Sequence, residues 1–202
     1  MVNIMSALAS SFTILFLFWS ITYLAKKLII HINGEFNDNG IITTLGAGIV
    51  GALAFTFSDS FWFSAVEGEV YAMSTFFTAI VFWAMLRWEA VADQPRHFRW
   101  IILIAFLIGL SIGVHLLNLL AIPAITFIYY FKRYKSSGKG ILVTGAISIG
   151  ILAIVMYVII PVVVSLAGGF EKFFVNRIGL PFNSGTLIYF FVLIGLIVIG
   201  LR

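Results

Sequence analysis

Long apolar segments separated by short polar stretches dominate the chain. The apolar segments are residues 4–25, 41–57, 70–87, 101–131, 141–164 and 186–201. An α-helix rises about 1.5 Å per residue, so about 20 apolar residues cross the roughly 30 Å hydrocarbon core of a bilayer. The pattern therefore predicts an all-α fold, a polytopic bundle of transmembrane helices.

The segment 101–131 is too long for one span. A single helix over it would be about 46 Å long. It would also place Arg96 and Arg99 on the opposite side of the membrane from Lys132 and Arg133. Two short spans joined by a turn near residues 114–117 remove both difficulties. The predicted number of spans is then about seven.

The basic residues predict the orientation of these spans, because cytoplasmic loops carry an excess of lysine and arginine. In the seven-span arrangement ten basic residues fall inside and two, Lys172 and Arg177, fall outside. The inner residues are Lys26, Lys27, Arg87, Arg96, Arg99, Lys132, Arg133, Lys135, Lys139 and Arg202. This bias predicts an N-terminus outside. The acidic stretch 58–69, the turn at 114–117 and the loop 168–185 then share the outer side.

The composition excludes an ordinary soluble domain. Hydrophobic residues make up 62% of the chain and charged residues only 10%, against about half and a quarter in soluble proteins. The net charge of +4 comes from clusters between apolar segments, so it indicates topology and membrane lipids as partners, and no nucleic acid. The chain has no cysteine, which excludes disulfides, thiolate metal sites and cysteine nucleophiles.

No soluble domain flanks the spans. The chain starts shortly before one apolar segment and stops directly after another. We therefore expect residues 1–202 to form a single transmembrane domain that is part of a longer chain. A complete protein with an odd number of spans is the alternative.

The acidic stretch carries the leading candidates for chemistry: Asp59, Glu67 and Glu69. Carboxylates so close to hydrocarbon are costly, and they usually face a water-filled cavity, a cation or a partner. We interpret them as catalytic candidates, with Glu67 or Glu69 as the ligand if a divalent metal ion is bound. An ordinary interfacial loop, with Phe61, Trp62 and Phe63 in an aromatic belt, is the other interpretation.

The turn and the last outer loop supply candidates for substrate binding: His115, Asn118 and Arg177. Each also has a structural interpretation. His115 can be a packed turn histidine, Asn118 can cap a helix, and Arg177 can contact lipid headgroups. Glu67 and Glu69 share a side only if their segment is extended; if a helix begins at Glu67, they diverge by about 200°.

Two motifs resemble a known family. They are residues 58–73, Ser-Asp-Ser-Phe-Trp-Phe-Ser-Ala-Val-Glu-Gly-Glu-Val-Tyr-Ala-Met, and residues 109–120, Gly-Leu-Ser-Ile-Gly-Val-His-Leu-Leu-Asn-Leu-Leu. Both resemble a bacterial family of large polytopic membrane proteins that is similar to protein O-mannosyltransferases and has the C-type glycosyltransferase fold. The resemblance covers nearly all of the chain.

This resemblance implies a function. A sugar would pass from a polyprenyl-phosphate donor to a protein or envelope glycan acceptor on the outer face of the bacterial inner membrane. An acceptor hydroxyl needs a general base, and a phosphate leaving group needs cations or a divalent metal. In this family the base is expected on a first outer loop with a Trp-Asp-x-x-Glu-type motif, which the chain lacks. A non-catalytic subunit or scaffold is therefore the main alternative. A transporter is a further one, although it would be expected to show repeated halves.

Overall fold

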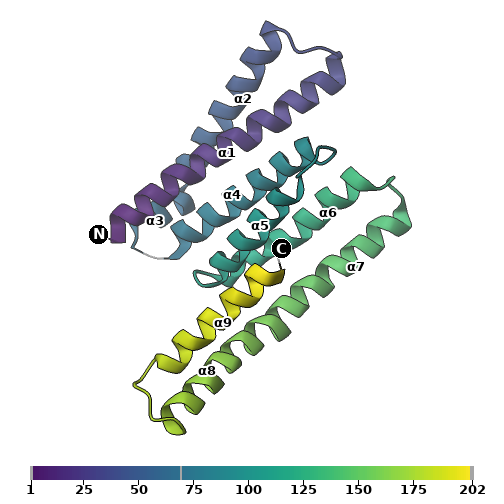
Figure 1. Ribbon diagram of the computed structural model, residues 1–202. Helices are drawn as coiled ribbons and strands as arrows, with labels where there is room; N and C mark the ends of the chain where they lie inside the picture. The colour runs from purple at the N-terminus through teal and green to yellow at the C-terminus, as the bar shows by residue number, and fades with distance from the viewer. Residues whose placement is uncertain (1, 69, 201–202) are drawn as a thin grey trace. The chain divides into compact units, whose positions relative to one another are not determined.

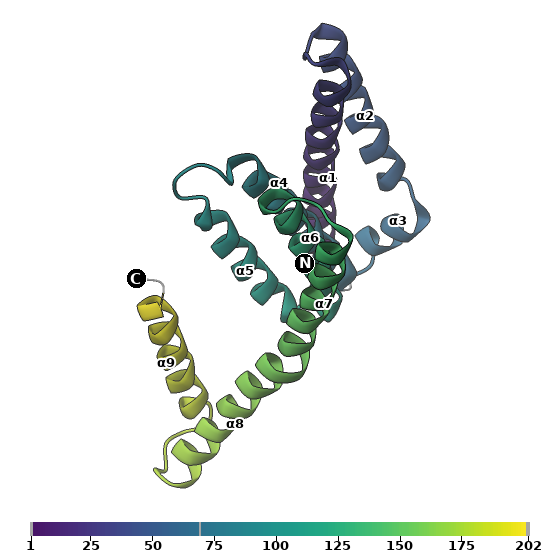
Figure 2. The same cartoon turned by 90° about the vertical axis from the view of Figure 1, so that its right-hand side faces the viewer.

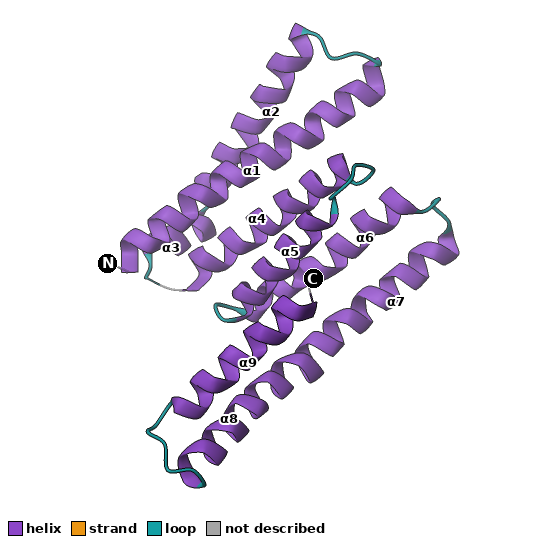
Figure 3. Cartoon of the chain, in the orientation of Figure 1, coloured by secondary structure: helices purple, strands orange, loops and turns teal. Residues whose placement is uncertain are grey.

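The computed structural model describes residues 2–68 and 70–200, and every regular element in that part of the chain is helical (Figure 3). The helices are α1 (Val2–Asn33), α2 (Asp38–Thr56), α3 (Asp59–Val66), α4 (Val70–Val91), α5 (Phe98–Ile112), η1 (Leu116–Leu120), α6 (Ala121–Arg133), α7 (Gly138–Ile154), η2 (Val155–Ile159), α8 (Ile160–Asn176) and α9 (Ser184–Gly200). The all-helical class is confirmed. Two compact units, residues 1–148 and 149–202, are described separately below.

Several of these helices can cross a membrane. Within the described ranges four helical segments are long and apolar enough: Asn3–Asn33, Asp38–Thr56, Val70–Val91 and Gly138–Asn176. The helices α5 and α9 are shorter but also apolar. The chain is therefore a membrane protein, while seven spans with an outer N-terminus stay a prediction.

The first two helices form a hairpin with a shorter loop than expected. The turn formers Asn33-Gly34 and Asn37-Asp38-Asn39-Gly40 predict a loop over residues 28–40, but α1 continues to Asn33. Residues 28–32 contain no glycine or proline, so nothing in them stops a helix before Asn33-Gly34. Gly34 has φ +76°, which glycine adopts without strain. Asn37 then caps α2 by accepting a hydrogen bond from the Gly40 N–H at 3.0 Å.

Small residues on α2 let it approach α1 closely, as the sequence predicts for this helix. Ala47 and Gly51 lie four residues apart, which predicts that this pair forms the contact face. In the structure Ala47 is exposed, and Gly48 and Gly51 face α1. A Cβ atom at Gly48 would lie 2.5 Å from the Thr22 methyl group. The contact therefore includes Gly51 of the predicted pair, with Gly48 in place of Ala47.

Small residues recur every four positions along α5, at 105, 109 and 113, which predicts a face for tight helix packing. The structure does not use this face. Ala105, Gly109 and Gly113 are all exposed, and a Cβ at Gly109 would meet nothing within 4 Å among the described residues. The bulky face with Ile104 and Leu107 is buried instead. Burying branched aliphatic side chains fills more space, so these residues determine which face packs.

The core of the first unit forms around α4. Its buried residues Met85 and Trp88 pack with Ile104 and Leu107 of α5. Figure 1 shows α4 between α1 and the pair α5 and α6, and the Trp88 ring stacks on Tyr129 of α6 with ring centroids 5.2 Å apart. This packing fixes the position of the C-terminal half of α4.

The segment 101–131 is interrupted as predicted. Helix α5 ends at Ile112, a 3₁₀ turn covers Leu116–Leu120, and α6 begins at Ala121. In Figures 1 and 2 the chain reverses at this interruption and α6 returns alongside α4. The prediction of two short helices in place of one long helix is confirmed.

In the second unit the helical stretch is longer than predicted. We expected a span over 141–164 and an outer loop from residue 168, but α7, η2 and α8 follow one another without a break to Asn176. The π-helical turn Val155–Ile159 ends two residues before Pro161, and such a turn accommodates the missing proline N–H. The loop to α9 is therefore only residues 177–183.

Hydrogen bonds to Glu171 connect this shorter loop and the start of α9 to α8. The Glu171 carboxylate accepts hydrogen bonds from the backbone N–H groups of Asn183, at 2.6 Å, and Thr186, at 2.8 Å. The Thr186 hydroxyl donates a third, at 3.1 Å. Glu171 is thus occupied in holding the start of α9.

Candidate functional site

The acidic stretch folds around the short helix α3. Asp59 is exposed in the first turn, where the helix dipole favours a carboxylate. Glu67 follows the last turn and is also exposed. Eight residues of helix separate the two acids by about 12 Å along the axis. The described residues therefore do not bring these two carboxylates together.

The backbone at Glu67 removes one of the alternatives. Its φ of −79° and ψ of 140° are extended, and the next helix begins only at Val70. The interpretation in which a helix starts at Glu67 is therefore wrong. Glu69 lies outside the described residues, so the prediction that the two glutamates share a side stays a prediction.

The turn between α5 and α6 lies beside the end of the acidic stretch. The His115 ring is 5.7 Å from the ring of Tyr71, in the first turn of α4. Nδ1 of His115 accepts a hydrogen bond from the Leu117 N–H at 3.1 Å and caps the 3₁₀ turn. A ring that accepts at Nδ1 carries its proton on Nε2, which leaves one N–H donor available.

Asn118 is buried and holds the turn against α4. Its Oδ1 accepts hydrogen bonds from the hydroxyls of Ser74, at 3.1 Å, and Thr78, at 2.6 Å. The Nδ2 group is buried and has no hydrogen-bond partner among the described residues. The capping role considered for Asn118 is wrong, because His115 caps this turn and Asn118 lies inside it.

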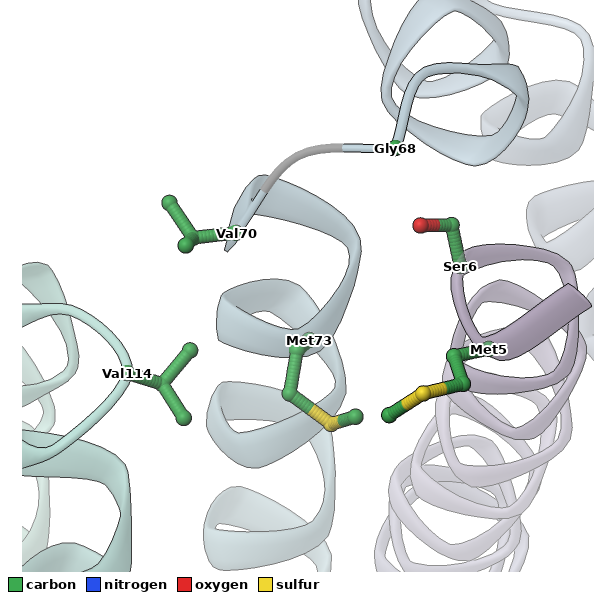
Figure 4. Close-up of a pocket in the computed structure, with 6 residues that line it drawn as sticks. All are labelled: Met5, Ser6, Gly68, Val70, Met73 and Val114. Atoms are coloured by element: carbon green, nitrogen blue, oxygen red, sulfur yellow. The ribbon is translucent and has the colours of Figure 1, made fainter. Parts of the chain in front are cut away.

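A pocket of about 410 Å³ opens where α1, α4, the α3–α4 link and the turn meet. Its lining residues are Met5, Ser6, Gly68, Val70, Met73 and Val114 (Figure 4). The side chains of Met5 and Met73 point toward each other across it (Figure 4). The pocket is mainly apolar. Glu67 directly precedes the lining residue Gly68 in the chain.

Sequence reasoning missed several residues of this region. Ser74 and Thr78 lie four residues apart in an apolar helix, so they share a face, and this spacing was a signal for a polar partner. The pocket residues Met5 and Met73 carry no such signal, because methionine is common in any apolar helix. Their meeting depends on the packing of α1 on α4.

Arg177 belongs to the second unit, where it follows the last turn of α8 and is exposed. Its backbone N–H bonds the carbonyl of Phe173 at 3.0 Å. The structure therefore gives Arg177 a place at the α8–α9 loop, and its binding role stays a prediction.

The described residues do not assemble a metal site. Over residues 2–68 and 70–200 no three His, Asp or Glu side chains gather to hold an ion. Hard divalent cations take six or more oxygen ligands, and Glu67 is the one carboxylate described next to the pocket. What the region offers is a carboxylate acceptor at Glu67 and N–H donors at His115 and Asn118.

One sequence family matches the chain. The family described as the protein O-mannosyl-transferase TMEM260 N-terminal domain matches residues 1–138. The matched range contains α3, the pocket and the turn with His115 and Asn118, and it excludes Arg177. No curated protein and no solved structure matches.

Proposed function

The chain belongs to the family of the protein O-mannosyl-transferase TMEM260 N-terminal domain, and from this premise we propose that it transfers a sugar from a polyprenyl-phosphate donor to a hydroxyl group of a protein or envelope glycan acceptor. The match indicates a glycosyltransferase-like function for a membrane protein. The donor and the acceptor are part of the proposal. The family description makes mannose the sugar to test first.

One juxtaposition supports this proposal most directly. The contact between His115 and Tyr71 places the α5–α6 turn beside the acidic stretch, and an apolar pocket opens between them. A polyprenyl-phosphate needs an apolar surface for its first isoprene units and polar groups for its phosphate and sugar. The pocket and its surroundings offer both within one end of the first unit.

We assign roles to the residues from their chemistry. The acceptor oxygen attacks the anomeric carbon, the bond from that carbon to the phosphate oxygen breaks, and the acceptor proton passes to a carboxylate base. The resembled family is expected to carry this base on its first outer loop, and Glu67 is the candidate for it among the described residues beside the pocket. The N–H groups of His115 and Asn118 donate hydrogen bonds to the sugar or the leaving phosphate. Glu69 and Asp59 complete the catalytic candidates. Arg177, which belongs to the second unit, stays a candidate for binding a phosphate group through its guanidinium.

A divalent cation is compatible with this assignment. Glu67 or Glu69 would be the carboxylate ligand if such an ion is bound, and the ion would neutralise charge on the leaving phosphate. No step above depends on the ion.

The proposed location is the outer face of the bacterial inner membrane. Ten of the twelve basic residues lie on the inner side in the seven-span arrangement, which puts the N-terminus, the acidic stretch and the turn outside. The donor would then enter from the outer leaflet.

A non-catalytic subunit or scaffold is the second candidate. The described residues place a single carboxylate, Glu67, beside the pocket. A protein that presents the donor to another subunit would need the pocket and the N–H donors but no general base.

Transfer of mannose from polyprenyl-phosphate mannose to a peptide containing serine and threonine tests both candidates. With purified protein we expect Glu67→Gln to lower turnover about 10²–10⁴-fold, the usual effect of removing a general base. Glu35→Gln is the matched control, because Glu35 is an exposed glutamate in the α1–α2 loop and should leave the rate unchanged. Unchanged turnover in Glu67→Gln would exclude Glu67 as the base. Donor binding without transfer would favour the scaffold.

A further inference from the structure

A second groove lies at the other end of the same helices. It has a volume of about 380 Å³ and is formed by α1, α2 and α4. Figures 1 and 2 show α1 between α2 and α4. Met5 in the first pocket and Lys26 in this groove are 21 residues apart on α1, or about 31 Å. The two sites are therefore separated by about the thickness of the hydrocarbon core.

The floor of this groove is apolar and aromatic. Trp19 and Trp83 line it with ring centroids 5.6 Å apart, and Leu86 adds an aliphatic surface. Trp19 remains exposed although it packs on Trp83. Tryptophan is typical of the boundary between hydrocarbon and headgroups, so this floor suits an acyl chain close to its glycerol end.

Two cationic side chains also line this groove. Lys26 and Arg87 both line the groove and are exposed. Lys26 lies over the Phe36 ring, 4.8 Å from its centroid, and neither cation forms an ion pair with an acid of the described ranges. Their charge is thus available to an anion.

The nearby carboxylate does not neutralise these cations. Glu89 pairs with Lys27, and it also accepts a hydrogen bond from the Tyr23 hydroxyl at 3.3 Å. Its charge is balanced by Lys27. The groove therefore keeps a positive excess of two.

Thr44 adds an independent observation. It lines the groove from α2, and its hydroxyl is buried without a hydrogen-bond partner among the described residues. A buried hydroxyl in a helix usually donates to the carbonyl four residues earlier, as Thr22 does to Phe18 at 2.9 Å. The Thr44 donor is thus left for a ligand acceptor.

We propose that this groove binds an anionic phospholipid, whose phosphodiester lies between Lys26 and Arg87 and whose acyl chain covers Trp19, Trp83 and Leu86. The charge excess requires an anion, and the aromatic floor requires an apolar chain on the same molecule. A soluble phosphate would satisfy the first requirement and leave the floor uncovered. In the proposed topology the lipid belongs to the inner leaflet, away from the donor site.

Quenching of tryptophan fluorescence by lipids with brominated acyl chains tests this site without any activity measurement. Purified protein in phosphatidylcholine nanodiscs is titrated with brominated phosphatidylglycerol, and brominated phosphatidylcholine serves as the neutral lipid. A basic residue near a membrane surface strengthens anionic lipid binding about fivefold, so two should give a preference of about 25-fold. We expect the double variant Lys26→Gln, Arg87→Gln to lose most of this preference.

The matched control removes the same charge elsewhere. Lys135 and Lys139 are exposed and do not line the groove, so Lys135→Gln, Lys139→Gln should keep the preference. Arg87→Lys keeps the charge and should retain most of the binding. An equal loss in the control pair would show diffuse surface attraction, and no preference for phosphatidylglycerol in the wild type would also overturn the proposal. Displacement of the lipid by inorganic phosphate, compared with chloride at equal ionic strength, would reassign the groove to soluble anions.

Discussion

Asn118 shows at the scale of a single residue how a polar side chain specifies the packing of an apolar bundle. Its amide oxygen accepts from two hydroxyls of α4, so the turn and α4 fit in one register only. Such bonds are worth more for specificity than for energy in a membrane protein, where measured values average about 0.6 kcal/mol. Leaving a buried hydrogen-bond donor or acceptor unpaired costs more free energy than such a bond contributes.

We therefore expect Asn118→Ala to destabilise the folded protein by about 1–3 kcal/mol, because it leaves the Ser74 hydroxyl without its acceptor. Thermal unfolding in detergent measures the change. Asn39→Ala alters an exposed asparagine near the start of α2 and should stay within about 0.5 kcal/mol. Identical unfolding of Asn118→Ala and wild type would show that these hydrogen bonds do not hold the turn.

Asp93 is the residue whose environment predicts a pH dependence. The hydrogen bond from Lys132, at 2.7 Å, and its positive charge hold the pKa of Asp93 below its ordinary value of 3.8, and Arg133 adds to this. A carboxyl with a lowered pKa in the folded state contributes stability above its unfolded pKa. That contribution is lost as the pH falls through the lower folded pKa.

Acidification from about pH 6 to about pH 3 should therefore reduce the contribution of Asp93 to stability. The side chain is 72% exposed, so we expect a small effect. The variant Asp93→Asn should show less acid destabilisation than the wild type when unfolding midpoints are compared at both pH values. A larger acid effect in Asp93→Asn would contradict the lowered pKa.

At the scale of elements, the close approach of α1 and α2 depends on two glycines. A Cβ at Gly48 would lie 2.5 Å from the Thr22 methyl group and 2.8 Å from the Phe18 ring, and one at Gly51 would lie 2.6 Å from Ile21. Thr22 is β-branched and stiff, so these helices would have to separate to admit a side chain. Separation would also change the groove, which α1 shares with α2 and α4.

Gly48→Ala should thus destabilise the protein by about 1–3 kcal/mol, the usual cost of overpacking. Gly46→Ala is the matched control on the same helix, because a Cβ there meets nothing within 4 Å among the described residues. That substitution should be neutral or stabilising by up to about 1 kcal/mol through helix propensity. Unfolding midpoints in detergent compare the two. The opposite ranking would show that α1 and α2 do not approach at Gly48.

At the scale of the whole molecule, the seven-span arrangement predicts the orientation of the chain in the membrane. Because the chain has no cysteine, a thiol reagent would label only the cysteine that is introduced. Leu116 and Ser136 are exposed and lie at opposite ends of α6. We expect Leu116→Cys to react with an impermeant thiol reagent in intact cells, and Ser136→Cys to react only after permeabilisation. Labelling of Ser136→Cys in intact cells would show that this loop lies outside and that the predicted orientation is inverted.

The sequence was sufficient for the features that depend on local composition and spacing. Apolar segments longer than about 17 residues predict membrane helices because backbone groups must be satisfied within the segment. The length of the segment 101–131 and the charges on its two sides predicted its interruption. Asn33-Gly34 and Asn37 marked real helix boundaries. The two motifs identified the family.

Side-chain packing decided the rest. The predicted ends of α1 and α8 were wrong because a helix can extend from the hydrocarbon core into water. No strong stop signal lies in either sequence where the core ends. The packed faces of α2 and α5 depend on which neighbour each meets. Position along the chain could not show that His115 meets Tyr71, that Asn118 meets Ser74 and Thr78, or that Lys26 and Arg87 share a groove. Contacts between residues far apart in sequence depend on how the helices pack. The sequence by itself therefore determined the all-helical class, the family and most of the helices, and only the tertiary structure decided which residues form the two sites.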